Sequence, residues 1–232
     1  LNQVEIEQSM SNYTEFNIPK IIYLSSVDST NNYAKFLSDS ITEDFLIVSD
    51  MQTLGKGRRG RSWVSPSGVG IWMSLCIRPL IKIENASMIT LIMAISICDA
   101  LESLYSLKSN IKWPNDIVIN SKKISGILTE MSSDIDGIKY IISGIGINAN
   151  TTDFPDDIRD TATSLYLESG IYINRAKLIA EIIYYFYQNL NIFLNTEDMS
   201  TLKTKYESYL INIGKIVKIL DPEGSYTAKA IG

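Results

Sequence analysis

The sequence predicts an α+β fold in which a mixed, mainly antiparallel central sheet is flanked by helices. Two kinds of pattern support this prediction. Residues 123–148 contain two adjacent strand patterns joined by an Asp-Gly turn, which is typical of an antiparallel pair. Residues 85–107 and 174–194 instead repeat apolar side chains near the 3.6-residue period of a helix. At 232 residues, the chain is long enough for one substantial core, with or without a small appendage.

Short strands are expected in the first part of the chain, at residues 20–24, 45–48 and 71–77. A short helix should follow the first strand, and its candidate N-caps are Asp28, Ser29 and Thr30. Helical spacing places three apolar residues on the buried side of this helix: Tyr33, Phe36 and Leu37. Taken alone, the polar residues at its start need no role beyond capping.

The second part of the chain begins with strand signals on both sides of a Trp-Pro-Asn-Asp break at residues 113–116. A polar loop is expected over residues 150–160, and helices over residues 162–169, 174–194 and 198–210. The final residues, 214–230, have the pattern of a β-hairpin around the turn Asp221-Pro222-Glu223-Gly224. A lone hairpin is marginally stable, so this one should pack on the preceding domain or belong to a small β domain.

Composition excludes several kinds of site. The formal net charge of −5 argues against a general nucleic-acid-binding protein, and the complete absence of histidine excludes a histidine base or a histidine-ligated metal. Cys76 and Cys98 lie in apolar runs, which is typical of buried thiols in a reducing compartment. No uninterrupted apolar run reaches the roughly 18 residues of a membrane span, and the N-terminus lacks a secretion signal. We therefore expect a cytoplasmic protein without a membrane partner.

The most unusual stretch is residues 52–63, in which four cations alternate with three glycines between Gly55 and Arg61. Glycine allows the backbone to approach a ligand closely, while lysine and arginine match phosphate oxygens. A solvated basic loop is the alternative, but this stretch ends in the apolar surface of Trp63. The pattern favours a polyphosphate ligand.

Three glycines interrupt the strand patterns of residues 123–148: Gly126, Gly144 and Gly146. Interior glycines weaken a strand unless something needs the space above them. They suggest a ligand lying against the sheet, although a bulge or close helix packing explains them equally well.

Five stretches, in this order, resemble the biotin protein ligase family, the biotin–acetyl-CoA-carboxylase ligases: Ser29-Thr30-Asn31, the Gly55–Arg61 loop with Trp63, Lys112-Trp113-Pro114-Asn115-Asp116, Lys123–Leu128 and Gly144–Asn148. The resemblance covers about residues 21–232. Two positions depart from the family pattern: Lys56 replaces an arginine, which keeps the charge but loses the forked geometry, and Ser125 replaces a common alanine.

The resemblance implies a class II synthetase-like biotinyl/lipoyl ligase fold. It places the catalytic domain over residues 1–210 and the start of an incomplete SH3-like β-barrel over residues 211–232. Biotin and ATP with Mg²⁺ would give biotinyl-5′-adenylate, and the biotin would then pass to a lysine of a biotin carboxyl carrier protein. Joining a carboxylate to a phosphate brings like charges together, so fixed cations are needed.

The resemblance also assigns residues to each role, without a resident metal site. Biotin would contact Ser29, Thr30, Asn31, Gln52, Lys56, Gly57, Arg58, Lys123, Gly144 and Gly146. The nucleotide would contact Arg58, Arg61, Trp63, Lys112, Asn115, Asp116 and Asn148. The chemistry would depend on Lys123, Arg58, Lys112 and Asp116. Taken singly, the two lysines could be surface residues of strands, and Trp63 a core aromatic.

Only about twenty residues precede the first expected strand, too few for the DNA-binding domain of the family's regulatory branch. We therefore expect the ligase-only form with no DNA partner, as a monomer or a homodimer. Two alternatives remain: a lipoate or octanoate ligase of the same fold, and a non-catalytic sensor of biotin or its adenylate. The sensor would bind without releasing pyrophosphate.

Overall fold

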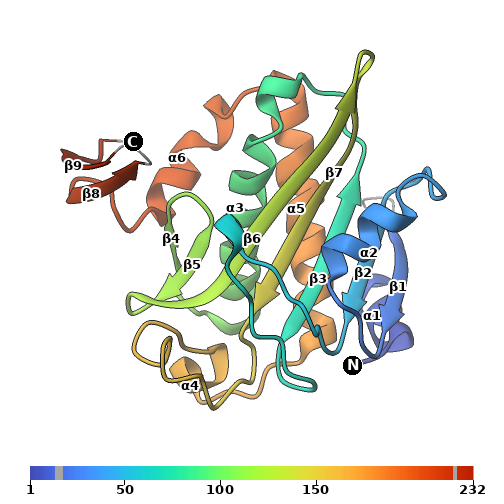
Figure 1. The fold of residues 1–232 in the computed structure, drawn as a ribbon, viewed down its shortest axis with the longest axis horizontal. Coiled ribbons are helices and arrows are strands. Elements are labelled where there is room, and N and C mark those ends of the chain that lie inside the picture. Colours follow the sequence, from blue (N-terminus) through green and yellow to red (C-terminus); the bar gives the residue numbers. More distant parts are fainter. Residues whose placement is uncertain (14–17, 222–223, 232) are drawn as a thin grey trace.

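A seven-stranded sheet forms the centre of the protein (Figure 1). The structure is a computed structural model that describes residues 1–13, 18–221 and 224–231. The strand order is β1-β2-β3-β7-β6-β5-β4, in which β1 and β2 are parallel and every other neighbouring pair is antiparallel. The strands are β1 (Lys20–Leu24), β2 (Phe45–Ser49), β3 (Ile71–Ile77), β4 (Asn110–Lys112), β5 (Asp116–Ile119), β6 (Lys122–Asp134) and β7 (Gly137–Ile147). The predicted mixed, mainly antiparallel sheet is confirmed.

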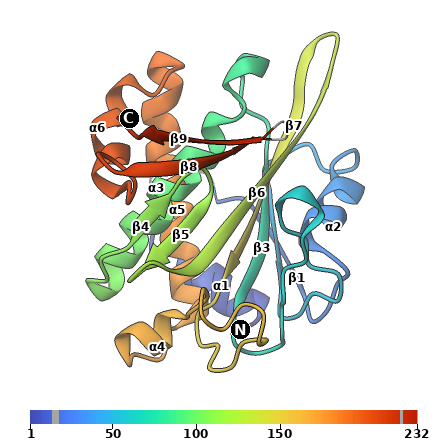
Figure 2. The ribbon, with the colours of Figure 1, turned by 60° about the vertical axis from the view of Figure 1, so that its left-hand side comes forward.

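The helices cover the two faces of this sheet unequally. They are α1 (Gln3–Met10), α2 (Thr30–Leu37), α3 (Met88–Tyr105), α4 (Leu165–Ser169), α5 (Arg175–Thr196) and α6 (Ser200–Tyr209), with short 3₁₀ turns at Arg58–Gly60 and Ile83–Asn85. Figure 2 shows α3, α5 and α6 on one side of the sheet and α2 on the other. The main apolar core lies under α1, α3 and α5, and a smaller cluster lies under α2.

Strand β7 shows which face is left open. Ile141 and Ile145 belong to the main core, whereas Ile142 belongs to the cluster under α2. Because side chains alternate along a strand, Gly144 and Gly146 face the α2 side. The helix covers only part of that face, so the glycines lie at the base of an open region.

Helix α3 is explained as a core helix. Among the described residues, one helical segment, Ile83–Tyr105, is long and apolar enough to cross a bilayer, but most of it is buried inside the protein. The predicted burial of both thiols is confirmed, for Cys98 in α3 and for Cys76 in β3. Burial raises the pKa of Cys76 to about 11 and that of Cys98 to about 12, so neither is a reactive thiol at neutral pH.

Two features of the helices differ from the sequence prediction. Helix α1 was not anticipated; it buries Ile6 and Met10 in the main core. The placement of Phe36 on the buried side of α2 is wrong, since this residue is 75% exposed. The buried side of α2 carries Thr30, Asn31 and Ala34 instead, because polar contacts turn the start of this helix toward the sheet.

The C-terminal strands β8 (Ile216–Asp221) and β9 (Gly224–Lys229) form a separate two-stranded antiparallel sheet. The predicted hairpin is therefore present. Residues 222 and 223 of its expected turn lie outside the described part of the chain. The short helix expected from residue 162 begins later, after Ser164, whose hydroxyl caps α4 by accepting from the Leu167 N–H.

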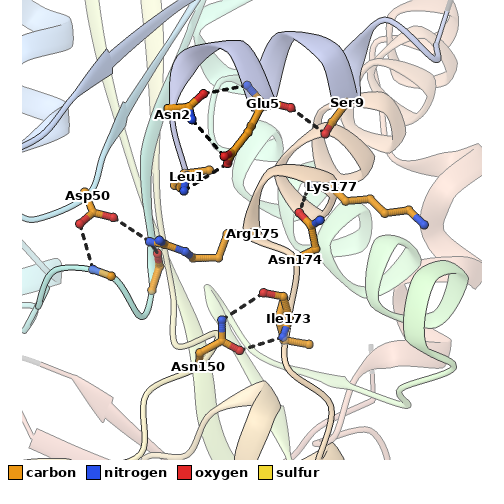
Figure 3. A network of polar contacts seen from close by, with 12 residues as sticks. Leu1, Asn2, Glu5, Ser9, Asp50, Asn150, Ile173, Asn174, Arg175 and Lys177 are labelled. Carbon is orange, nitrogen blue, oxygen red and sulfur yellow. Dashed lines mark hydrogen bonds and ion pairs between the residues drawn. The ribbon is translucent and has the colours of Figure 1, made fainter.

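The long loop between β2 and β3 is fastened at its base by Asp50 (Figure 3). One oxygen of its carboxylate accepts from Arg175 Nη1 at 2.8 Å, and the other accepts from the Ser67 hydroxyl and the Gly68 N–H. Burial raises the pKa of Asp50, but hydrogen bonds from Ser67 and Arg175 outweigh it and lower the pKa below its usual value. A single carboxylate thus ties both ends of the loop to the start of α5.

We expect Asp50→Asn to lower the free energy of unfolding by about 3 kcal/mol near neutral pH, because it leaves the nearly buried Arg175 without its counter-charge. These side chains are only 17% and 12% exposed. The stabilisation should be complete above the unfolded pKa of about 3.9, and it should be lost as the pH falls through the lower folded pKa.

Urea denaturation at several pH values would measure this effect. Asp153→Asn is the matched control, since that carboxylate is 93% exposed and should change stability by less than about 0.5 kcal/mol. An Asp50→Asn variant as stable as the wild type near pH 7 would contradict the clamp.

Candidate functional site

A cleft opens on the α2 side of the sheet, where the loop between β2 and β3 crosses β6 and β7. Its empty space is about 460 Å³ when the open mouth is included. Its lining comes from α2, the loop and the sheet: Ser29, Thr30, Asn31, Gln52, Lys56, Gly57, Arg58, Trp63, Asn115, Lys123, Gly126, Ile127, Leu128, Gly144, Ile145 and Gly146. All ten residues predicted to contact biotin are among them.

The floor of the cleft consists of glycine backbone. A Cβ atom at Gly144 would lie 2.1 Å from Asn31 Oδ1, and one at Gly146 would lie 2.5 Å from the indole of Trp63. Gly126 is opposite Gly146 in regular register between β6 and β7, whereas the pairing of β5 with β6 shifts by one residue just before Gly126, between Lys123 and Ser125. The floor glycines are needed because the side chains of Asn31 and Trp63 lie directly on the sheet.

The wall formed by the start of α2 is polar and buried. Ser29 and Thr30 are 1% and 3% exposed. The Thr30 N–H donates to Gln52 Oε1 at 2.8 Å, and Gln52 Nε2 donates to Ser65 Oγ at 2.9 Å. Ser29 occupies the N-cap position but its side chain makes no capping hydrogen bond. The Ser29 hydroxyl therefore does not have the capping role that the sequence suggested.

The glycine–cation loop spans the cleft, and we call residues 55–61 the flap. Lys56 Nζ donates to Asn32 Oδ1 on α2 at 2.7 Å. Arg58 Nη1 donates to Asn115 Oδ1 between β4 and β5 at 2.9 Å. These two contacts attach the flap to opposite sides of the cleft.

Lys123 places a cation beside the floor. Its backbone is fixed by the 150–163 loop, since Lys123 donates its N–H to Thr161 and accepts from Thr163. The ammonium nitrogen lies 2.7 Å from Asp116 Oδ1 and 5.1 Å from the centre of a Trp63 ring. The carboxylate and the aromatic face both hold the positive charge at this position.

Four residues predicted to serve the nucleotide do not line the cleft. Asp116 forms an ion pair with Lys123, which lines the cleft. Lys112 and Arg61 are exposed. Asn148 is buried, and its side chain donates to Thr163 O at 3.0 Å, which supports the loop beside Lys123. Their roles toward a nucleotide stay predictions.

Two polar residues at the site were missed by sequence reasoning, Ser74 and Glu130. Ser74 Oγ lies 2.6 Å from Asn31 Oδ1, and Glu130 accepts from Asn31 Nδ2 at 2.7 Å. A signal for Glu130 existed, because it follows Gly126 at a spacing of four on the same face of β6. In residues 1–13, 18–221 and 224–231, no group of three or more Cys, Asp or Glu side chains could hold a metal ion.

Comparison with known sequences gives matches to one family. The model of the biotin/lipoate A/B protein ligase family matches residues 23–148. The "Bifunctional ligase/repressor BirA" of Bacillus spizizenii is 40% identical over 215 residues, which are 91% of this chain and 66% of the relative. The "Biotin--acetyl-CoA-carboxylase ligase" of Paracoccus denitrificans is 35% identical over 127 residues, covering 54% of this chain and 52% of the relative. The chain thus spans slightly under two thirds of the length of the bifunctional relative.

Solved structures agree with this match. The biotin protein ligase of Aquifex aeolicus in complex with biotin and ATP aligns with a TM-score of 0.76 and 31% identity, covering 92% of this chain and 97% of that one. The Leishmania major biotin protein ligase in complex with biotinyl-5-AMP has the same fold, with a TM-score of 0.68, 24% identity, and coverage of 92% and 97%. The predicted ligase fold is confirmed.

Proposed function

The chain belongs to the biotin/lipoate A/B protein ligase family, and from this we propose that it activates biotin with ATP and attaches it to a carrier protein. The observation that carries the proposal is the layout of the cleft, which has a buried polar wall at α2 and the cations Lys56, Arg58 and Lys123 around it. This layout suits a small acid with a polar head group and a carboxylate. Biotin, with its cyclic urea and its valerate, is such an acid.

The polar wall would bind the cyclic urea. Ser29, Thr30, Asn31 and Gln52 supply short donors and acceptors, which fix the orientation of a ligand in a way that apolar contacts do not. Gly144 and Gly146 would let Asn31 and Trp63 lie against the sheet beside the ring system, and Gly57 would let the flap backbone pass close over it.

The cations would drive adenylate formation. A carboxylate oxygen of biotin attacks the α-phosphorus of ATP, and the bond to pyrophosphate breaks. Lys123 and Arg58 would balance the negative charge that gathers where these groups meet. Asp116 would keep the ammonium of Lys123 in place, given their 2.7 Å ion pair.

The nucleotide would lie beside Trp63 and Asn115, with Arg61, Lys112 and Asn148 placed around it. Mg²⁺ would enter with ATP, since this ion is commonly held by substrate phosphates with few protein ligands. In the second step, a lysine amine of the carrier attacks the acyl carbon of the adenylate and AMP leaves. The name of the Paracoccus relative supports a carrier domain of acetyl-CoA carboxylase as the acceptor.

Residues 1–210 would form the catalytic domain, and residues 211–232 would begin a separate SH3-like β domain. Two observations support this division. The strands β8 and β9 do not join the central sheet, and Ile216 and Tyr226 on them are 77% and 56% exposed.

Pyrophosphate release with biotin, lipoate or octanoate, each with MgATP, tests the proposed function. We expect release with biotin and little with lipoate or octanoate. Faster release with lipoate or octanoate would instead assign the chain to the lipoate ligases. Tight binding of biotin without any pyrophosphate release would identify a sensor.

The flap should become ordered when both substrates bind, because within the described part of the chain its side chains are fastened across the cleft by two hydrogen bonds alone, from the exposed Lys56 and Arg58. Trypsin cleaves after the four cations of the flap. We expect biotin with ATP to slow this cleavage at least about tenfold, by analogy with lids that close over substrates. Arg159, in an exposed loop, is the internal reference, and equal protection of both sites would argue against flap closure.

A further inference from the structure

The side chain of Asn31 is held from two directions. It is 4% exposed and lies on the Gly144 backbone. Its Nδ2 donates to Glu130 Oε2 at 2.7 Å and to Leu128 O at 3.3 Å. Its Oδ1 lies 2.6 Å from the hydroxyl of Ser74, which donates to it. Every polar atom of this amide therefore has a partner.

Glu130 determines which way the Asn31 amide points. A carboxylate only accepts hydrogen bonds, so a flipped amide would place its oxygen against the negative charge of Glu130. The Lys35 ammonium lies 2.5 Å from Glu130 Oε1. Burial raises the pKa of Glu130, but the bonds from Lys35 and Asn31 outweigh it and lower the pKa, so the group is ionised at neutral pH.

The orientation of the Asn31 amide, in the wall of the cleft, determines the direction of its hydrogen bond with Ser74. Asn31 Oδ1 can only accept, so it takes the single proton of Ser74. Thr30 Oγ1 lies 2.7 Å from Ser74 Oγ and 3.1 Å from Gln52 Oε1, to which its hydroxyl donates. The donors and acceptors of Asn31 thus have one arrangement, which is set by a residue that does not line the cleft, and Ser74 links this amide to Thr30.

We propose that Glu130 is a positioning residue for ligand recognition, which orients Asn31 so that the wall presents one fixed pattern of donors and acceptors to a cyclic urea. The inference rests on the proposed function. A urea ring has two N–H donors on either side of a carbonyl acceptor, so a wall with a mixed pattern would bind it less well. The Lys35–Glu130 pair is 40% and 29% exposed, and pairs this exposed contribute little to folding stability. The effect of Glu130 should therefore appear in binding.

Glu130→Gln tests the proposal, because glutamine keeps the size of the side chain and removes the charge that forbids the flip. We expect KM for biotin to rise about tenfold, the scale of a lost hydrogen bond to a charged group. KM for ATP and kcat should stay within about twofold, and Tm within about 2 °C. Calorimetric Kd values for biotin should rise in parallel with KM.

Two further variants separate this role from a structural one. Lys35→Ala removes the ion pair but leaves Glu130 bonded to Asn31, so it should change KM for biotin less than about threefold. In an Asn31→Ala background, Glu130→Gln should have no further effect on biotin binding, since the two residues act as one unit.

Several results would overturn the proposal. They are an unchanged KM for biotin in Glu130→Gln, an equal rise in Lys35→Ala, full additivity with Asn31→Ala, or a loss of kcat and Tm together. A wild-type protein that neither binds nor activates biotin would remove the proposed function and this inference with it. An active wild type together with a Glu130→Gln variant whose KM and Kd for biotin are unchanged would remove the inference alone.

Discussion

Replacement of Lys123 by alanine is expected to slow adenylate formation by more than about a hundredfold, the scale of one lost preorganised donor. Its ammonium is held beside the cleft floor by Asp116 and the face of Trp63. Because these contacts fix the charge before substrates arrive, no reorganisation is needed when the carboxylate meets the phosphate. Pyrophosphate release in a single turnover, with biotin and MgATP saturating, would measure the loss.

Lys122→Ala is the matched control for this experiment. Lys122 is the adjacent residue of β6, but it is exposed and does not line the cleft, so its removal should leave the rate within about twofold. A Lys123→Ala variant that releases pyrophosphate at nearly the wild-type rate would remove this residue from the mechanism.

Gly144→Ala is expected to weaken biotin binding by about ten- to a hundredfold, corresponding to the 1–3 kcal/mol of an overpacked interior. The added methyl group would lie 2.1 Å from Asn31 Oδ1. Asn31 cannot move aside without losing its bonds to Ser74 and Glu130. The wall that faces the ligand would therefore be displaced. Calorimetric titration with biotin would measure the change in Kd.

The neighbouring Ser143 provides a control on the opposite face of the same strand. Its hydroxyl lies 3.3 Å from that of Thr129, on the side of α3. Ser143→Ala should alter the Kd for biotin by less than about twofold, since its side chain lies on the face of the sheet opposite to the cleft. A Gly144→Ala variant that binds biotin as tightly as the wild type would show that Asn31 does not have to stay in place.

Periodicity was enough to predict the central strands and the long helices α3 and α5, because apolar repeats report directly on burial. It failed for α1, where only Ile6 and Met10 are buried in eight residues. It also failed for Phe36. Apolar spacing alone implied that this side chain is buried, whereas hydrogen bonds from Thr30 and Asn31 set the rotation of α2.

The cleft was predictable where a motif is local. The flap brings Lys56 and Arg58 to one place because they lie within three residues of each other, and the strand register does the same for the glycine floor. The contacts of Asn31 with Ser74 and Glu130 span 43 and 99 residues. Such pairs depend on how the helix docks on the sheet, which no local pattern in one sequence encodes.

The glycine floor limits how this protein could be redesigned for bulkier analogues of its ligand. Gly126 and Gly146 are paired across β6 and β7, so the deepest surface at this point is peptide backbone inside a hydrogen-bonded ladder. Backbone has no rotamer to change and no smaller residue to substitute. Extra room can come only from the helix and loop opposite, where Gln52 and Trp63 could be shortened.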